Sequence, residues 1–283
     1  MEVEAFAKVN LSLRLRARDA SGRHPLRSLV QSIDWADRLG LASAPEDAFT
    51  VTGLALPDDD ANLERRALRA ARAASSRPGP VALTLDKRIP IAAGLGGGSA
   101  DAAACLVLVA AHLGLSSGQR DALAPGLGAD VPFCLVGGTA WMESYGERLT
   151  PVPPLAGFWL AVVVPPFEVA TTAAYRRWDE LEGPAGPEVS GRDLPPELRP
   201  FAPLGNDLVP AARSLVPELG DWAADLERRW GRAVLMSGSG PALFGFFPTA
   251  SEAEGAAAVP GARGARACRP VPTGWRVPSG TLP

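Results

Sequence analysis

The chain has 283 residues, which is enough for two domains and a large buried core. Its 28 Lys and Arg against 31 Asp and Glu give a net charge of -3, so it lacks the basic field that would hold a nucleic acid. No stretch approaches the run of about 18 apolar residues needed to span a membrane, and the start lacks an export-signal pattern. We therefore expect a cytoplasmic globular protein without a nucleic-acid or membrane partner.

The three cysteines, Cys105, Cys134 and Cys268, are odd in number and far apart in the sequence. A framework of disulfides would need an even set, and a zinc site would need ligands at close spacing. We expect neither.

The first extended segment is residues 5–16, where apolar and polar residues alternate as in a half-buried strand. Lys8 and Asn10 fall on its polar face, two residues apart, so both would reach one cleft. A turn at 19–25 leads to a second extended segment at 26–35. A helix is predicted over 62–75, with Asn62 as its N-cap.

The most informative segment is residues 90–104, which read PIAAGLGGGSADAAA between a predicted strand at 81–87 and a predicted helix at 100–113. Glycine lets backbone N–H groups approach a ligand closely, and a helix N-terminus adds a positive dipole end. The segment is therefore predicted to cradle a phosphate. It matches neither the dinucleotide GxGxxG spacing nor the P-loop GxxxxGK[ST] pattern, and the alternative is a plain flexible turn.

The second half of the chain is predicted to begin after the Pro-rich residues 150–155, near a domain boundary at residue 152. Two further glycine-punctuated turns are predicted: GLGAD at 126–130 in the first half, before a strand that ends near Met142, and SGSGP at 237–241 in the second half, between strands at 233–236 and 243–247. The other expected elements are a helix at 116–123, a strand at 158–164, an exposed loop with at most one short helix at 182–203, helices at 207–229 and 251–258, and a frayed tail after Arg269.

Three separated motifs resemble the galactokinase, homoserine, mevalonate and phosphomevalonate (GHMP) kinase superfamily. They are AKVNLSLRL at 7–15, the glycine-rich segment at 90–104, and VLMSGSGPALFGFF at 234–247. Within that superfamily, HPL at 24–26, Gln31 and GADVPFCLVGGTAW at 128–141 resemble the branch that phosphorylates the 2-hydroxyl of a methylerythritol linked to cytidine diphosphate.

The resemblance implies an α+β, two-domain GHMP-kinase fold with the active site between the lobes. It implies an ATP-binding, ribosomal-protein-S5-like lobe at 1–152, a ferredoxin-like lobe at 153–270 and a tail at 271–283. ATP would be the co-substrate with Mg²⁺, although no dedicated metal site is predicted. The chain would act as a monomer or weak homodimer on a small molecule.

Phosphoryl transfer needs positioning, charge compensation and one group that takes the proton of the attacking hydroxyl. Asp130 is the candidate base, and the alternative for it is a helix cap. Lys8 would pair with Asp130 and steady the transferred group, and its alternative is a solvated strand lysine. Asn10 matches a substrate-contact position of the family.

The resemblance also implies binding residues on both sides of the reaction. The ATP set is Pro90, Ala92, Ala93, Gly94, Leu95, Gly96, Gly97, Gly98, Ser99 and Ala100, with Asn62 and Lys87 near adenine or ribose. The substrate set is Asn10, His24, Thr171, Tyr175 and Gly238, in which His24 reads the base and Tyr175 stacks on it. The family commonly has an aromatic residue before that histidine, whereas this chain has Arg23. Its guanidinium can stack on the base in place of the aromatic ring, and the alternative is that it points to solvent and leaves the base site with one wall.

Three alternatives compete with this interpretation. Another kinase of the superfamily would act on homoserine, mevalonate or a sugar. A non-catalytic nucleotide-binding module would be expected to have lost Lys8 or Asp130. A dinucleotide oxidoreductase would need a ribose-binding acid after a GxGxxG turn.

Overall fold

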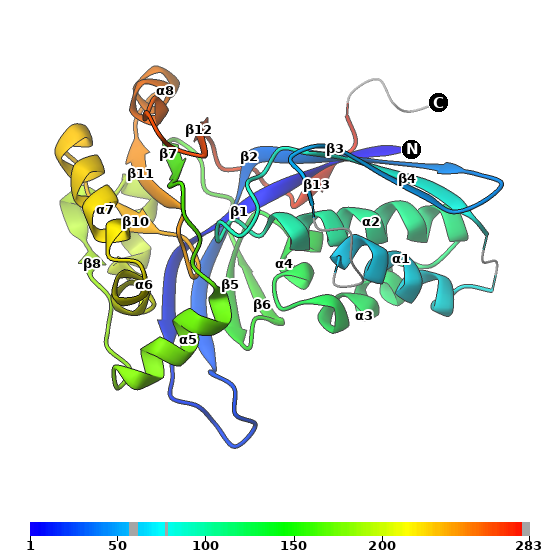
Figure 1. Ribbon diagram of the computed structural model, residues 1–283, viewed down its shortest axis with the longest axis horizontal. Helices are drawn as coiled ribbons and strands as arrows, with labels where there is room; N and C mark the ends of the chain where they lie inside the picture. The colour runs from blue at the N-terminus through cyan, green and yellow to red at the C-terminus, as the bar shows by residue number, and fades with distance from the viewer. Residues whose placement is uncertain (57–61, 77–78, 279–283) are drawn as a thin grey trace.

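The computed structural model describes residues 1–56, 62–76 and 79–278, which form two lobes side by side (Figure 1). The first lobe contains β1 (Glu2–Leu15), β2 (Leu26–Ser43), β3 (Ala48–Gly53), α1 (Leu63–Ala74), β4 (Val81–Lys87), α2 (Gly97–Leu113), α3 (Ser117–Leu127), α4 (Val131–Val136), β5 (Thr139–Ser144), β6 (Arg148–Val152) and β13 (Trp275–Arg276). The second contains β7 (Trp159–Val164), α5 (Thr171–Glu180), β8 (Glu188–Val189), the 3-10 helices η1 (Gly191–Asp193) and η2 (Pro196–Phe201), β9 (Leu204–Gly205), α6 (Val209–Leu215), α7 (Glu218–Trp230), β10 (Leu235–Met236), β11 (Leu243–Phe247), α8 (Ala250–Ala257) and β12 (Gly264–Cys268).

The first lobe is organised around the 18-residue strand β2, which pairs antiparallel with β1 along most of its length, with β5 at its beginning and with β4 at its end. Within the described residues the sheet has seven strands, in the order β13-β1-β2-β4-β3 with β5 and β6 branching from β2. Helices α1 to α4 lie on one side of this sheet (Figure 1). The apolar side chains between helices and sheet form one buried core.

The second lobe has a sheet of order β10-β11-β7-β12 in the described residues. Val9 and Leu11 of β1 are fully buried in one cluster with Leu160 of β7 and Phe244 of β11, so an apolar layer joins the two lobes. Because the polar face of β1 is buried as well, at Lys8 and Asn10, the strand is covered on both sides rather than half-buried as predicted.

Two predicted elements are wrong in type or extent, and a third element was missed. The apolar run after Asp130 is the helix α4, not a strand, and the strand begins only at Thr139. The single helix expected at 207–229 is divided into α6 and α7 at Val216 and Pro217, because proline cannot donate the hydrogen bond that would continue the first helix. The strand β3 was not predicted.

The tail after Arg269 is packed rather than frayed over its described part. Val271 N–H donates to Ser32 O at 2.9 Å, and Trp275 and Arg276 pair with β1. Trp275 Nε1 also donates to Leu135 O at 3.0 Å. The loop at 182–203 likewise differs, because it holds β8 and two 3-10 helices, and Leu194 and Leu198 are buried in it.

Candidate active site

The glycine-rich loop connects β4 to α2 in an unusual backbone conformation. Ala92, Gly94 and Gly96 have φ of 49°, 78° and 68°, a region that glycine adopts without steric cost. Helix α2 begins at Gly97, three residues earlier than predicted, so its free N–H groups come from the glycines themselves. These N–H groups and the positive end of a 17-residue helix make the loop an anion site.

The second glycine turn, SGSGP at 237–241, packs directly against this loop. Ser237 Oγ donates to Gly94 O at 2.8 Å, and Ala242 N–H donates to Ala93 O at 3.0 Å. Asn10 N–H of β1 donates to Ser237 Oγ at 3.1 Å. The two turns and β1 are therefore hydrogen-bonded to one another.

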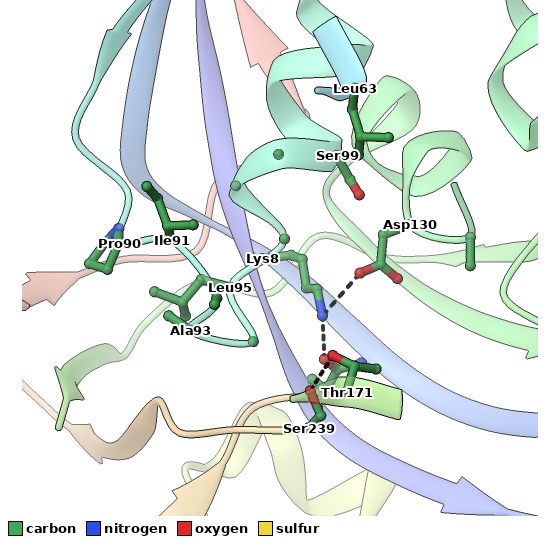
Figure 2. Close-up of a pocket in the computed structure, with 18 of the residues that line it drawn as sticks. Lys8, Leu63, Pro90, Ile91, Ala93, Leu95, Ser99, Asp130, Thr171 and Ser239 are labelled. Atoms are coloured by element: carbon green, nitrogen blue, oxygen red, sulfur yellow. Dashed lines mark hydrogen bonds and ion pairs between the residues drawn. The ribbon is translucent and has the colours of Figure 1, made fainter. Parts of the chain in front are cut away.

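Lys8 and Asp130 meet beside the loop, as Figure 2 shows. Lys8 Nζ lies 3.3 Å from Asp130 Oδ2 and donates to Asn10 Oδ1 at 2.6 Å. The Asn10 amide is oriented by its other end, because Nδ2 donates to Ser28 Oγ at 2.8 Å. Lys8 is almost fully buried, whereas 29% of the Asp130 side chain is exposed. The ammonium is thus held in place while the carboxylate faces open space.

Asp130 stands at the N-cap position of α4, but its side chain makes no capping hydrogen bond. A capping aspartate would accept from the N–H two or three residues later. The alternative of a structural helix cap is therefore not supported. The Asp130 carboxylate pairs with Lys8 and is available to accept a hydrogen bond from a ligand in the pocket.

The pocket between the lobes has a volume of about 550 Å³. Most of the predicted site residues line it, and Figure 2 shows the Ser99 hydroxyl on the same side as the Asp130 carboxylate. The predicted residues among its lining are Lys8, Asn10, Lys87, Pro90, Ala92, Ala93, Gly94, Leu95, Gly96, Gly97, Gly98, Ser99, Asp130, Thr171, Tyr175 and Gly238. Thr171 Oγ1 lies 2.8 Å from Ser239 Oγ, which ties the start of α5 to the second glycine turn.

The ammonium of Lys87 is buried between two carboxyl groups. Nζ lies 2.5 Å from Asp37 Oδ2 and 2.6 Å from Asp101 Oδ2, and 2% of the side chain is exposed. Burial lowers the pKa of Lys87, but the charges of Asp101 and Asp37 outweigh it and raise that pKa. The ammonium lies directly beneath the start of α2, since a Cβ on Gly97 would be 2.9 Å from Nζ. The ammonium is thus held by two carboxylates, while Lys87 also lines the pocket, and its adenine or ribose contact stays a prediction.

A third carboxyl group, that of Glu64, lies with this lysine in addition to those of Asp37 and Asp101. Burial raises the pKa of Asp101 well above its ordinary value, against the lowering effect of Lys87. Burial also raises the pKa of Glu64, which is 3% exposed. The site below the loop therefore holds one lysine and three carboxyl groups away from water.

Asn62 caps α1, as the sequence predicted. Its Oδ1 accepts from Glu64 N–H at 3.1 Å and from Arg65 N–H at 3.5 Å. In the described part of the chain it is Leu63, not Asn62, that lines the pocket. The nucleotide contact of Asn62 stays a prediction.

His24 and Tyr175 come together from different lobes, with ring centroids 5.4 Å apart. The imidazole of His24 also contacts Trp178, edge to face at 5.4 Å, and only 5% of its side chain is exposed. Burial raises the pKa of Tyr175 to about 12, with the nearby Asp130 carboxylate adding to it, so its phenol keeps its proton.

Arg23 packs on an aromatic ring within the protein. Its guanidinium carbon lies 4.0 Å from the ring centroid of Tyr145, which lines the pocket. The Tyr145 hydroxyl also donates to Asp19, in the turn that carries Arg23. Hydrogen bonds from the hydroxyls of Ser21 and Tyr145 lower the pKa of Asp19 to about 2. Tyr145, in the turn between β5 and β6, therefore presents an aromatic ring to the pocket next to Arg23.

Tyr145 and Asp179, which accepts from His24, are the site residues that sequence reasoning missed. The scarcity of tyrosine is a sequence signal that could have pointed to Tyr145, because the chain has only two tyrosines. Both of them line the pocket. No local pattern marks Asp179, which lies in an ordinary charged helix.

In the residues that the structure describes, no cluster of three His, Cys, Asp or Glu side chains could bind a metal ion. None of the helices described there is long and apolar enough to cross a membrane.

Comparison with known proteins agrees with this geometry. The family models for the GHMP kinases N terminal domain and the GHMP kinases C terminal match residues 62–138 and 195–265. The chain is a member of the GHMP kinase superfamily. Homoserine kinase from Cytophaga hutchinsonii shares this fold, with a TM-score of 0.68 at 18% identity over 98% of this chain and 96% of that one.

Closer relatives narrow the class. A 4-diphosphocytidyl-2-C-methyl-D-erythritol kinase from Moorella thermoacetica is 40% identical over 87% of this chain and 89% of its own length. Another from Caulobacter is 40% identical over 91% and 93%. A crystal structure of 4-(cytidine 5'-diphospho)-2C-methyl-D-erythritol kinase matches with a TM-score of 0.77 at 36% identity, over 95% of this chain and 99% of that one. Within the superfamily, the chain belongs to the 4-diphosphocytidyl-2-C-methyl-D-erythritol kinases.

Proposed function

We propose that this protein transfers the γ-phosphoryl group of ATP to the 2-hydroxyl of 4-diphosphocytidyl-2-C-methyl-D-erythritol, in the non-mevalonate route to isoprenoids. The observation that carries the proposal is the Lys8–Asp130 pair at 3.3 Å, set between the phosphate loop and the pocket. A kinase needs its base and its charge-compensating cation at that junction.

The residues divide the chemistry between them. The substrate oxygen attacks the γ-phosphorus as its proton passes to Asp130, and the bond to the bridging oxygen breaks so that ADP leaves. Lys8 compensates the negative charge on the transferred group, and the hydrogen bond from Lys8 to Asn10 holds the ammonium in place. We therefore assign Asn10 to positioning Lys8 as well as to the substrate side of the pocket.

ATP is assigned to the glycine-rich loop, where the N–H groups of residues 94–100 would receive its phosphates. Mg²⁺ fits this site as an ion carried by the phosphates, because Mg²⁺ commonly uses few protein ligands alongside a nucleotide. Ser99 is the protein oxygen that would join it. When bound, the ion would screen the phosphate charge; the protein supplies orientation and the base.

The cytidine end is assigned to the region where Tyr175 and His24 meet, at the side of the pocket formed by α5. A flat base needs an aromatic surface and hydrogen-bonding groups at its edge. Tyr145 with Arg23 offers a second aromatic surface, and Thr171 and Gly238 line the pocket nearby.

The proposal places the enzyme in the cytoplasm as a monomer or weak homodimer. Its three cysteines are buried and unpaired, which suits a reducing compartment. One chain brings together the loop, Lys8, Asp130 and Tyr175, so the site needs no second copy.

A coupled assay of ADP release tests the function with three acceptors: the cytidyl substrate, homoserine and mevalonate. Turnover is expected with the cytidyl substrate alone, and turnover with another acceptor instead would overturn the assignment. Replacing the base, in Asp130→Ala, should lower kcat by at least about 100-fold while ATP still binds. Asp121→Asn, an exposed acidic residue of α3, is the matched control and should leave kcat unchanged.

A further inference from the structure

Helix α5 presents three side chains to His24 from one face. Trp178 and Asp179 lie three and four residues after Tyr175, so both are neighbours of Tyr175 on the helix surface. The imidazole packs on the rings of Tyr175 and Trp178, although His24 itself belongs to the turn between β1 and β2. Its ring is therefore fixed in orientation, with 5% of the side chain exposed.

One ring nitrogen of His24 is committed within the protein. Nε2 lies 2.6 Å from Asp179 Oδ1, and Arg18 Nε lies 2.8 Å from the other carboxylate oxygen. An ionised carboxylate only accepts hydrogen bonds, so the hydrogen of this contact belongs to Nε2. Because Arg18 already balances the charge of Asp179, the imidazole need not be charged to make the contact.

Within the described residues, the hydrogen bond of the imidazole is made through Nε2, and the other ring nitrogen, Nδ1, makes none. In a neutral imidazole with hydrogen on Nε2, Nδ1 carries a lone pair and can only accept. The polar atom left for a ligand at this buried ring is therefore an acceptor.

We propose that Asp179 is a positioning residue that holds His24 in the Nε2–H tautomer and so makes the site selective for a base with an exocyclic amino group. The inference rests on the proposed function, in which the base lies beside Tyr175 and His24. The 4-amino group of cytosine donates to Nδ1, whereas the 4-carbonyl oxygen of uracil would face its lone pair. Asp179 thus sets the choice between cytidine and uridine without touching either.

Titration calorimetry with CDP and UDP tests this choice. The wild type should bind CDP more tightly, and Asp179→Ala should reduce the ratio of the two affinities by about tenfold or more, because the imidazole can then turn Nδ1–H toward the ligand. Asp179→Glu keeps an acceptor and should recover part of the ratio. Glu180→Gln, next to it on the outer side of α5, should leave the ratio unchanged.

A spectroscopic measurement tests the tautomer of His24 with Asp179 unchanged. Long-range ¹H–¹⁵N correlation at about pH 8, where histidine is ordinarily neutral, distinguishes the two tautomers. The chain has only His24 and His112, so His112→Gln assigns the signals. A protonated Nε2 and an unprotonated Nδ1 on His24 are expected. Hydrogen on Nδ1, or an average of both forms, would contradict the proposal.

The two levels of the proposal fail separately. A wild type that does not turn over the cytidyl substrate contradicts the proposed function. A wild type that does, with the same CDP to UDP ratio in Asp179→Ala, contradicts only the role of Asp179.

Discussion

The contact between the two glycine turns gives a prediction whose size follows from geometry. In Gly94→Ala the new Cβ would lie 2.2 Å from Ser237 O, and the residue would keep a φ of 78° that alanine rarely adopts. Since ordinary contact begins near 3.4 Å, the two backbones must separate by about 1 Å. That movement breaks the hydrogen bonds from Ser237 Oγ to Gly94 O and from Ala242 N–H to Ala93 O.

The loss of stability in Gly94→Ala can be compared with that of a control glycine that also has a positive φ but lacks the close contact. Left-handed alanine costs about 1–2 kcal/mol, and two hydrogen bonds add about 0.5–1.5 kcal/mol each, so Gly94→Ala should lose about 2–5 kcal/mol of unfolding free energy. Gly114→Ala has a similar φ of 73° and no atom within 4 Å, so it should lose only the backbone term.

Urea titration of both variants measures the difference, and steady-state kinetics measures its effect on the site. Gly94→Ala should also lower kcat/KM by at least about tenfold, because a shift of about 1 Å in a positioning loop is costly. Equal stability losses in the two variants, with normal kinetics in Gly94→Ala, would refute the claim that the turn-to-turn contact holds the phosphate loop.

Three other substitutions test separate parts of the structure. Lys87→Met leaves buried carboxyl groups without their cation and should cost about 3–5 kcal/mol, whereas Arg88→Met, at an exposed ion pair, should cost less than about 1 kcal/mol; thermal and urea unfolding compare them. Asn62→Ala should lose about 1 kcal/mol of unfolding free energy, and Asn62→Ser should keep most of it, because serine also caps a helix. Equal stability in the wild type and both variants would contradict a stabilising role for the cap. Tyr145→Ala should raise KM for the cytidyl substrate by about fivefold or more with little change in KM for ATP, since one aromatic contact is worth about 1 kcal/mol; an equal rise for both substrates would contradict a place at the base.

The parts of the site that the sequence predicted are those with a local signal. The glycine cluster between a strand and a helix marks the phosphate loop by itself, and alternation along the first strand places Lys8 and Asn10 on one face. Both follow from neighbours in the chain, so no tertiary information was needed.

The parts that the sequence did not predict depend on contacts between distant segments. Lys87 ends a strand as many surface lysines do, and only the fold brings Asp37 and Asp101 around it. Asp179 reaches His24 across 155 positions of sequence. The run VPFCLV is short and apolar, a pattern that suits either a strand or a buried helix, and packing decides for α4.

The position of phosphorylation tests the central proposal most directly. The 2-hydroxyl sits on a carbon that carries no hydrogen, so a phosphate there has no proton three bonds away. In the proton-coupled ³¹P spectrum of the product from ATP and the cytidyl substrate, we expect a new monoester signal without splitting, and none with Asp130→Ala. A new signal split by neighbouring protons, or no new monoester at all, would contradict the proposed reaction.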